Sequence, residues 1–159
     1  MIDANKYYYP IDRVPEFWEW LIFQGDEGKI KVPIEIFEEI LAGSDELVYW
    51  IKDDLTKNAL LLNEDVSPSN VAKVVSEGYA SDLTDVEIEK LGRDPFLLAY
   101  GLVDKNHRVI VTTEASKSSK LRANKHIPDV ARFFNIRSVN TFQLTRELDF
   151  RTNWNSNSP

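Results

Sequence analysis

A long apolar segment followed by a short one, over residues 93–114, restricts this chain to folds that can bury both. The segment reads RDPFLLAYGLVDKNHRVIVTTE. Its first part predicts a helix with apolar side chains on every face, and its second part contains the β-branched run Val109–Val111, which is typical of strands inside parallel sheets. We therefore expect a buried helix and a buried strand in an α/β fold.

An acidic residue stands at each end of this unit. Asp94 opens the helix, and Glu114 follows the strand, at the edge where open α/β sheets bind their ligands. Asp94 before Pro95 is also a favoured helix start, which needs no functional explanation. However, positions 94, 97, 98 and 101 share a helical face that is otherwise apolar, so a carboxylate there needs a hydrogen bond, an ion pair or a cation.

Composition limits the functions that the chain can have. The formal net charge of −7 would repel nucleic acid overall, so any contact with it must be local. The absence of cysteine excludes disulfides, thiolate metal sites and cysteine nucleophiles, and predicts a cytoplasmic protein. No apolar run approaches the ~18 residues of a membrane span. Glycine-rich nucleotide-binding motifs and HExxH are missing, so oxygen ligands remain the expected metal donors.

Helices alternate with short strands along the whole pattern. This predicts one three-layer α/β/α domain over residues 1–150 with a parallel sheet, followed by a flexible polar tail over residues 151–159. Glu35, Glu38 and Glu39 are expected on a solvated helix face. The predicted helices cover residues 15–28, 33–43, 45–55, a segment from Ser67, 84–92, 94–103, 128–134 and 141–148, and the predicted strands cover 29–32, 60–62 (or a buried connection), 109–111 and 136–139.

A local basic segment follows Glu114. Residues 115–128 carry Lys117, Lys120, Arg122, Lys125 and His126 without an acid. Such a segment is either a solvated loop or a contact for phosphate groups. Asp129, just after it, has the ordinary interpretation of a first-turn acid that interacts favourably with the helix dipole.

Three motifs occur in a specific order: IEIFEEIL with Glu39, RDPFLLAYGL with Asp94, and VIVTTE followed by the basic loop and IPDVARFF. Together they resemble a PIN domain, the metal-dependent ribonuclease fold of VapC-type toxins. The front stretch YYYPIDRVPEFWEWL and the VTTE, IPDV and NTFQ stretches also resemble a bacterial PIN-like family labelled as a domain of unknown function.

The resemblance implies an endoribonuclease in which acidic residues hold Mg²⁺ or Mn²⁺ for attack on an RNA phosphodiester. It assigns catalysis to Glu39, Asp94 and Glu114, and it adds Asp3 and Asp129 as further metal ligands. It assigns RNA contacts to the four loop cations Lys117, Lys120, Arg122 and Lys125. The implied partners are RNA, an antitoxin protein and a second copy of the chain, with no membrane. The alternative is a non-catalytic PIN-fold protein that binds RNA or an antitoxin.

The start of the chain allows two alignments to this family, whose first, central strand ends in an aspartate. In one, IDAN is the strand-ending motif and Asp3 is a metal ligand. In the other, IDANKYYYP is the turn after that strand, and the strand with its aspartate lies upstream of Met1. The second alignment predicts a marginal sheet, because unpaired ladder groups in a core cost about 1–3 kcal/mol each.

Overall fold

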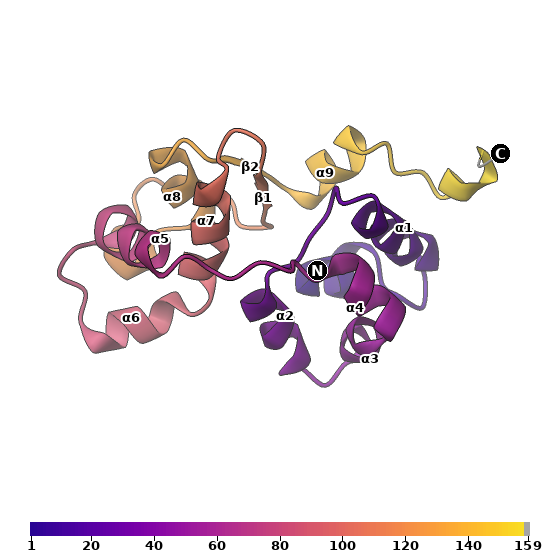
Figure 1. The fold of residues 1–159 in the computed structure, drawn as a ribbon, viewed down its shortest axis with the longest axis horizontal. Coiled ribbons are helices and arrows are strands. Elements are labelled where there is room, and N and C mark those ends of the chain that lie inside the picture. Colours follow the sequence, from indigo (N-terminus) through magenta and orange to yellow (C-terminus); the bar gives the residue numbers. More distant parts are fainter. Residues whose placement is uncertain (158–159) are drawn as a thin grey trace. The chain divides into compact units, whose positions relative to one another are not determined.

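A computed structural model of the chain describes residues 1–157. Most of this part is helical, and it contains a small two-stranded parallel sheet, so the fold is of the α/β type (Figure 1). Strand β1 (Val109–Val111) pairs in parallel with β2 (Arg137–Val139), with Ile110 opposite Ser138. The α-helices are α1 (Pro15–Asp26), α2 (Ile34–Leu41), α3 (Glu46–Lys52), α4 (Asp54–Leu60), α5 (Pro68–Lys73), α6 (Asp85–Leu91), α7 (Asp94–Val103), α8 (Ile127–Phe133) and α9 (Thr141–Glu147).

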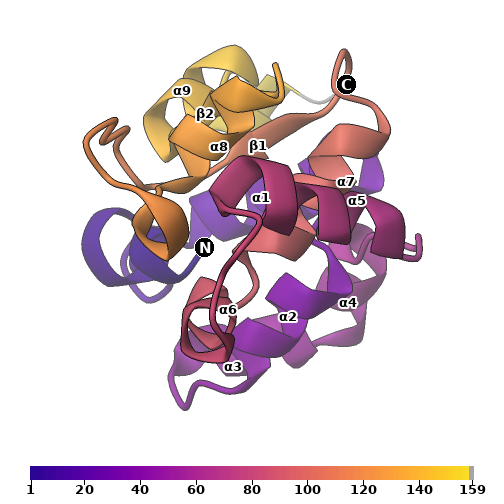
Figure 2. The ribbon, with the colours of Figure 1, turned by 90° about the vertical axis from the view of Figure 1, so that its left-hand side faces the viewer.

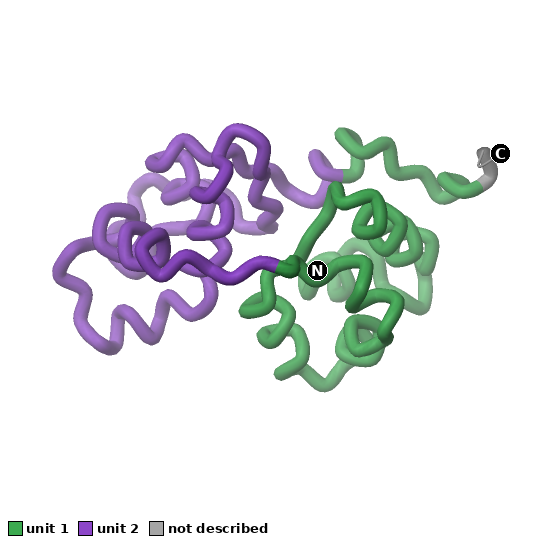
Figure 3. Tube along the Cα trace, in the orientation of Figure 1, with its two compact units in different colours: residues 1–63, 145–159 green, residues 64–144 purple. Residues whose placement is uncertain are grey.

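The chain forms two compact units (Figure 3). Unit 1 contains residues 1–63 and the segment from Thr145 onward, and unit 2 contains Glu64–Leu144. The domain predicted over residues 1–150 spans both units. In the predicted tail, the Trp154 indole donates to the Glu16 carbonyl at 3.1 Å, and its ring lies 5.0 Å from that of Phe23; residues 158 and 159 lie outside the described residues.

Unit 1 is built on the aromatic residues of α1. Phe17, Trp18 and Trp20 are almost fully buried, and the Trp18 indole donates to the Tyr9 carbonyl at 2.8 Å. Gly25 allows α1 to approach α4 closely, because a Cβ at this position would lie 2.8 Å from the Ala59 carbonyl oxygen. The tryptophans therefore belong to the core, where a large aromatic side chain contributes most.

Two sequence predictions in unit 1 are wrong in detail. The strand expected over residues 29–32 is reduced to one bridge between Val32 and Leu61, because the amides of Lys29 and Ile30 donate to the Gln24 carbonyl at the end of α1. The helix expected over residues 45–55 is two helices, α3 and α4. Asp53 separates them, since it is extended and its carboxylate caps the first turn of α4.

Unit 2 places α7 against β1 and α8 against β2 (Figure 2). Gly101 permits the close approach of α7, because a Cβ there would lie 3.0 Å from Ile110. The prediction that the whole strand is buried is wrong. Ile110 is 3% exposed, whereas Val109 and Val111 are 38% and 39% exposed. This alternation is typical of a strand that is covered on one face only.

Helix starts were predicted well in unit 2. Ser67 caps α5, Thr84 and Glu87 form the predicted capping box of α6, and Asn140 pairs with Gln143 at the start of α9. α5 continues into a wider turn, η2 (Val74–Tyr79), which ends at a buried tyrosine. No helix in residues 1–157 combines the length and the apolar character that a bilayer crossing requires.

Candidate functional site

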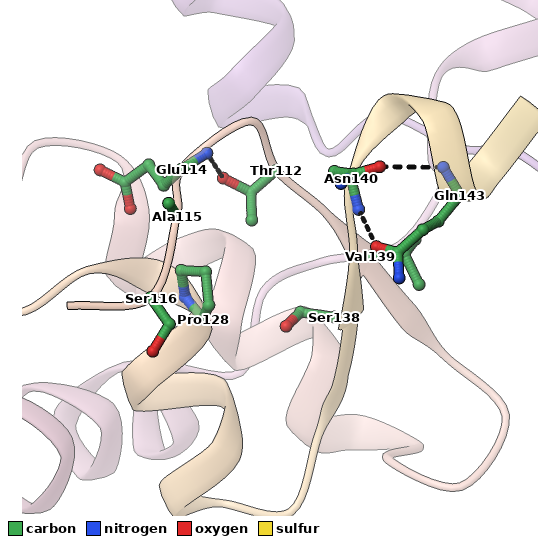
Figure 4. A pocket seen from close by; sticks show the side chains of 9 residues that line it. All are labelled: Thr112, Glu114, Ala115, Ser116, Pro128, Ser138, Val139, Asn140 and Gln143. Carbon is green, nitrogen blue, oxygen red and sulfur yellow. Dashed lines mark hydrogen bonds between the residues drawn. The ribbon is translucent and has the colours of Figure 1, made fainter. Parts of the chain in front are cut away.

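A pocket of about 220 Å³ lies in unit 2 at the carboxyl ends of β1 and β2 (Figure 4). Parallel strands present this edge to ligands in open α/β folds. Polar side chains from both strand ends line the pocket, and the amide of Thr112 extends the strand pairing by donating to the Val139 carbonyl at 3.0 Å. The lining residues are Thr112, Glu114, Ala115, Ser116, Pro128, Ser138, Val139, Asn140 and Gln143.

Glu114 is held in place at the rim of this pocket. Its Oε2 accepts a 2.7 Å hydrogen bond from the amide of Ile127, the first residue of α8, and its own amide donates to the Thr112 hydroxyl at 3.2 Å. The residue remains exposed. A carboxylate at the positive end of a helix is favourable, so this contact with α8 stabilises the position of Glu114 just beyond β1.

The negative charges of Asp94 and Glu114 both influence the pKa of the buried Tyr79 hydroxyl. Tyr79 is 3% exposed, and its hydroxyl has no hydrogen-bond partner among the described residues. Burial raises the pKa of Tyr79, and the negative charges of Asp94 and Glu114 raise it further. The phenol therefore stays protonated, and the charges of two acids, one at each end of the α7–β1 unit, both influence one buried hydroxyl.

Asp129 makes several contacts within the protein. Its two oxygens accept hydrogen bonds from the Ser116 hydroxyl and from the Lys117 amide at 2.7 Å, and Arg132 lies 3.5 Å away. Burial raises the pKa of Asp129, but these hydrogen bonds and the charge of Arg132 outweigh it, so the net shift is downward. Asp129 thus anchors the start of the basic loop to α8.

The four loop cations divide into two pairs. The Arg122 guanidinium binds Glu87 at 2.8 Å and Asp82 at 2.6 Å, and the Lys125 ammonium donates to the carbonyls of Gly78 and Tyr79 at 2.6 and 3.2 Å. These two cations hold the loop against α6 and η2. Lys117 and Lys120 are exposed. The exposed pair is therefore better placed for the predicted contact with phosphates.

The Arg122 contacts predict a pH-dependent stability. Hydrogen bonds from Arg122, followed by that from the Thr84 amide, lower the pKa of Glu87 from 4.5 to about 2. Because the folded-state pKa is the lower one, the contribution is fully present above about pH 4.5 and is lost as the pH falls toward 2. Glu87→Gln should therefore lower the free energy of unfolding near neutral pH, and this difference from the wild type should shrink on acidification.

Denaturant unfolding at a series of pH values measures this difference. Glu89→Gln, an exposed change on the same helix, is the control and should stay within about 0.5 kcal/mol of the wild type. A Glu87→Gln effect of the same size at neutral and at strongly acidic pH would contradict the assigned role of Arg122.

A protein-family model covers nearly the whole chain. A family model described as a domain of unknown function, DUF4411, matches residues 1–152. The chain belongs to the DUF4411 family. No curated protein and no solved structure matches it. The DUF4411 match runs through both units and includes every predicted site residue.

The predicted acidic residues of this DUF4411 chain fall into two sets. Asp94, Glu114 and Asp129 belong to unit 2, and Asp3 and Glu39 belong to unit 1. In unit 1, burial lowers the pKa of the Met1 amino group, and Asp3 and Glu39 act against this as nearby negative charges. Among the described residues, no three Asp, Glu or His side chains gather closely enough to form a metal site of three protein ligands.

The predicted solvated acidic face of α2 needs a correction. Glu39 is exposed as expected, but Glu35 is only 8% exposed, and its Oε2 has no partner among the described residues. Glu35 lies in the first turn of a short helix, where the dipole favours an acid. Sequence reasoning also missed Tyr79, because a tyrosine at the end of a helix carries no pattern that separates a site residue from a core residue.

Proposed function

We propose that this DUF4411 chain is a PIN-like ribonuclease that depends on Mg²⁺ or Mn²⁺, with the three-layer α/β/α architecture of PIN domains. One observation carries the proposal. Asp94 and Glu114, the acids at the ends of the α7–β1 unit, both influence the same buried hydroxyl electrostatically, and Glu114 lines the pocket at the carboxyl ends of the parallel strands. A site of this type was expected from the order of the sequence motifs.

The donors in unit 2 fit a hard divalent cation. Asp94 and Glu114 offer carboxylate oxygens, and Mg²⁺ in proteins is commonly bound by one or two carboxylates, with water and substrate phosphate completing its coordination. A bound cation would activate water for attack on a phosphodiester and neutralise charge that develops on the phosphate. Asp129 is not needed for this arrangement, because its oxygens already anchor Ser116 and Lys117.

The chain's own residues would then orient the reacting groups. The Ile127 amide fixes one oxygen of Glu114. The Tyr79 hydroxyl is buried and stays protonated, since its pKa is raised, so it adds no negative charge near the two carboxylates. Lys117 and Lys120 would contact RNA phosphates, an interaction that positions the strand without selecting a sequence and weakens in salt.

RNA cleavage tests the proposal directly. Labelled single-stranded and structured RNAs should be cut in Mg²⁺ or Mn²⁺, and excess chelator should abolish the cut. Binding without cleavage would favour the non-catalytic PIN-fold protein. Cleavage that survives chelation would refute the metal-dependent assignment.

A further inference from the structure

A second pocket in unit 2, of about 240 Å³, combines positive charge with exposed apolar side chains. Its lining includes Gly78, Lys120, Leu121, Lys125, Arg132 and Phe133. Three of the lining residues are cations, and Asp129 is the acid among them. The local balance is therefore positive in a chain whose formal net charge is −7, and such a local excess favours an anionic ligand.

Phe133 presents an aromatic surface that is both exposed and fixed in orientation. Its side chain is 59% exposed, and its ring meets that of the buried Phe134 edge to face, with centroids 4.9 Å apart and an interplanar angle of 85°. Leu121, 68% exposed, lines the same pocket. An aromatic ring held in this way has little orientational freedom to lose when a planar group stacks on it.

Arg132 is also prepositioned next to Phe133. Its guanidinium donates to the Ser116 hydroxyl at 3.0 Å and lies 3.5 Å from Asp129, while the side chain remains 66% exposed. Lys120 is exposed and lies in the same pocket wall. A flat ring beside two solvent-facing cations is the combination that binds single-stranded nucleic acid, where bases stack on aromatics and phosphates meet Lys or Arg.

We propose that this pocket binds single-stranded RNA, with one base stacked on Phe133 and adjacent phosphates on Lys120 and Arg132. The proposal rests on the proposed ribonuclease function and names the form of its substrate. It also adds two residues of α8, Arg132 and Phe133, to the RNA contacts expected from the basic loop.

This second pocket is connected to the pocket at Glu114 by a hydrogen bond. Asp129, in the lining of the second pocket, accepts from the hydroxyl of Ser116, which lines the first pocket together with Glu114. A strand whose base stacks on Phe133 would extend along this contact toward Glu114.

Binding of labelled oligouridylate in the presence of chelator, followed by fluorescence anisotropy, separates recognition from cleavage. Phe133→Leu should weaken binding about tenfold, since one base–aromatic stack is worth about that much or more, and Phe133→Trp should restore it. Lys120→Gln should weaken binding. It should also flatten the slope of log K against log[salt] by about 0.7, the value for one phosphate contact to a single strand. Tyr49→Leu and Lys105→Gln, at exposed positions outside the pocket lining, are the matched controls and should bind like the wild type.

An abasic version of the oligonucleotide keeps the phosphates and removes the bases. The wild type should bind it about tenfold less tightly than oligouridylate, whereas Phe133→Leu should bind the two probes alike. Unchanged affinity of Phe133→Leu for oligouridylate, or equal wild-type affinity for single-stranded and duplex RNA, would overturn the pocket proposal even if the protein cleaves RNA. Stacking-dependent binding without any metal-dependent cleavage would support the pocket and refute the ribonuclease.

Discussion

Asp94→Asn is expected to lower the rate of Mn²⁺-dependent RNA cleavage by about 100-fold or more, because a bound cation supplies several kcal/mol of transition-state stabilisation. The amide keeps the shape of the side chain and removes its charge. RNA binding measured in chelator should change little, since a neutral residue at position 94 reduces repulsion of phosphates rather than adding to it. The expected signature is thus a fall in catalysis without a matching fall in affinity.

A matched control separates this effect from general loss of negative charge. Asp65→Asn alters an exposed acid of unit 2 and should leave cleavage within about twofold of the wild type, as expected for a surface change. Asp94 also opens α7, where the helix dipole contributes about 0.3–1 kcal/mol, so the melting temperature of Asp94→Asn should fall only slightly. Equal cleavage by Asp94→Asn and the wild type would remove Asp94 from the site.

Leu98→Ala is expected to lower the free energy of unfolding by about 2–5 kcal/mol, the range for deleting a fully buried leucine side chain and leaving a cavity. Leu98 is 0% exposed and belongs to the core of unit 2 together with Val74, Ile110 and Val130. It lies one helical turn after Asp94. Loss of its packing should therefore loosen the support of the candidate site as well as the core.

Denaturant unfolding of Leu98→Ala and Leu55→Ala tests this expectation. Leu55 is 74% exposed, so the same chemical change there should cost within about 0.5 kcal/mol. A cost for Leu98→Ala as small as that for Leu55→Ala would contradict the packing of α7 against β1 and α8.

Local capping chemistry explains which elements were predictable. Ser67, Thr84 and Asn140 each precede a helix with a suitable partner in the first turn, and all three caps are present. Competition for backbone hydrogen bonds between a segment and the helix before it was not predictable. The amides of Lys29 and Ile30 close α1 instead of forming a strand, and no pattern within residues 29–32 indicates that choice.

The candidate site was predictable where it depended on the end of a strand. Glu114 stands three residues after the apolar β-branched run Val109–Val111, and its position at the carboxyl edge follows from that spacing. The role of Arg122 was not predictable, because its partners Asp82 and Glu87 are distant in sequence. The exposure of Phe133 was not predictable either, since its apolar helical context resembles that of the buried Phe134.

A calorimetric titration with Mn²⁺ measures whether Asp94 and Glu114 together hold a cation. We expect saturable binding at millimolar metal or below by the wild type and by Asp65→Asn, and loss of that binding in the double variant Asp94→Asn/Glu114→Gln, with all proteins folded by circular dichroism. Mn²⁺ binding of equal strength in the double variant, or no binding by the wild type at millimolar metal, would show that these two acids do not form a cation site.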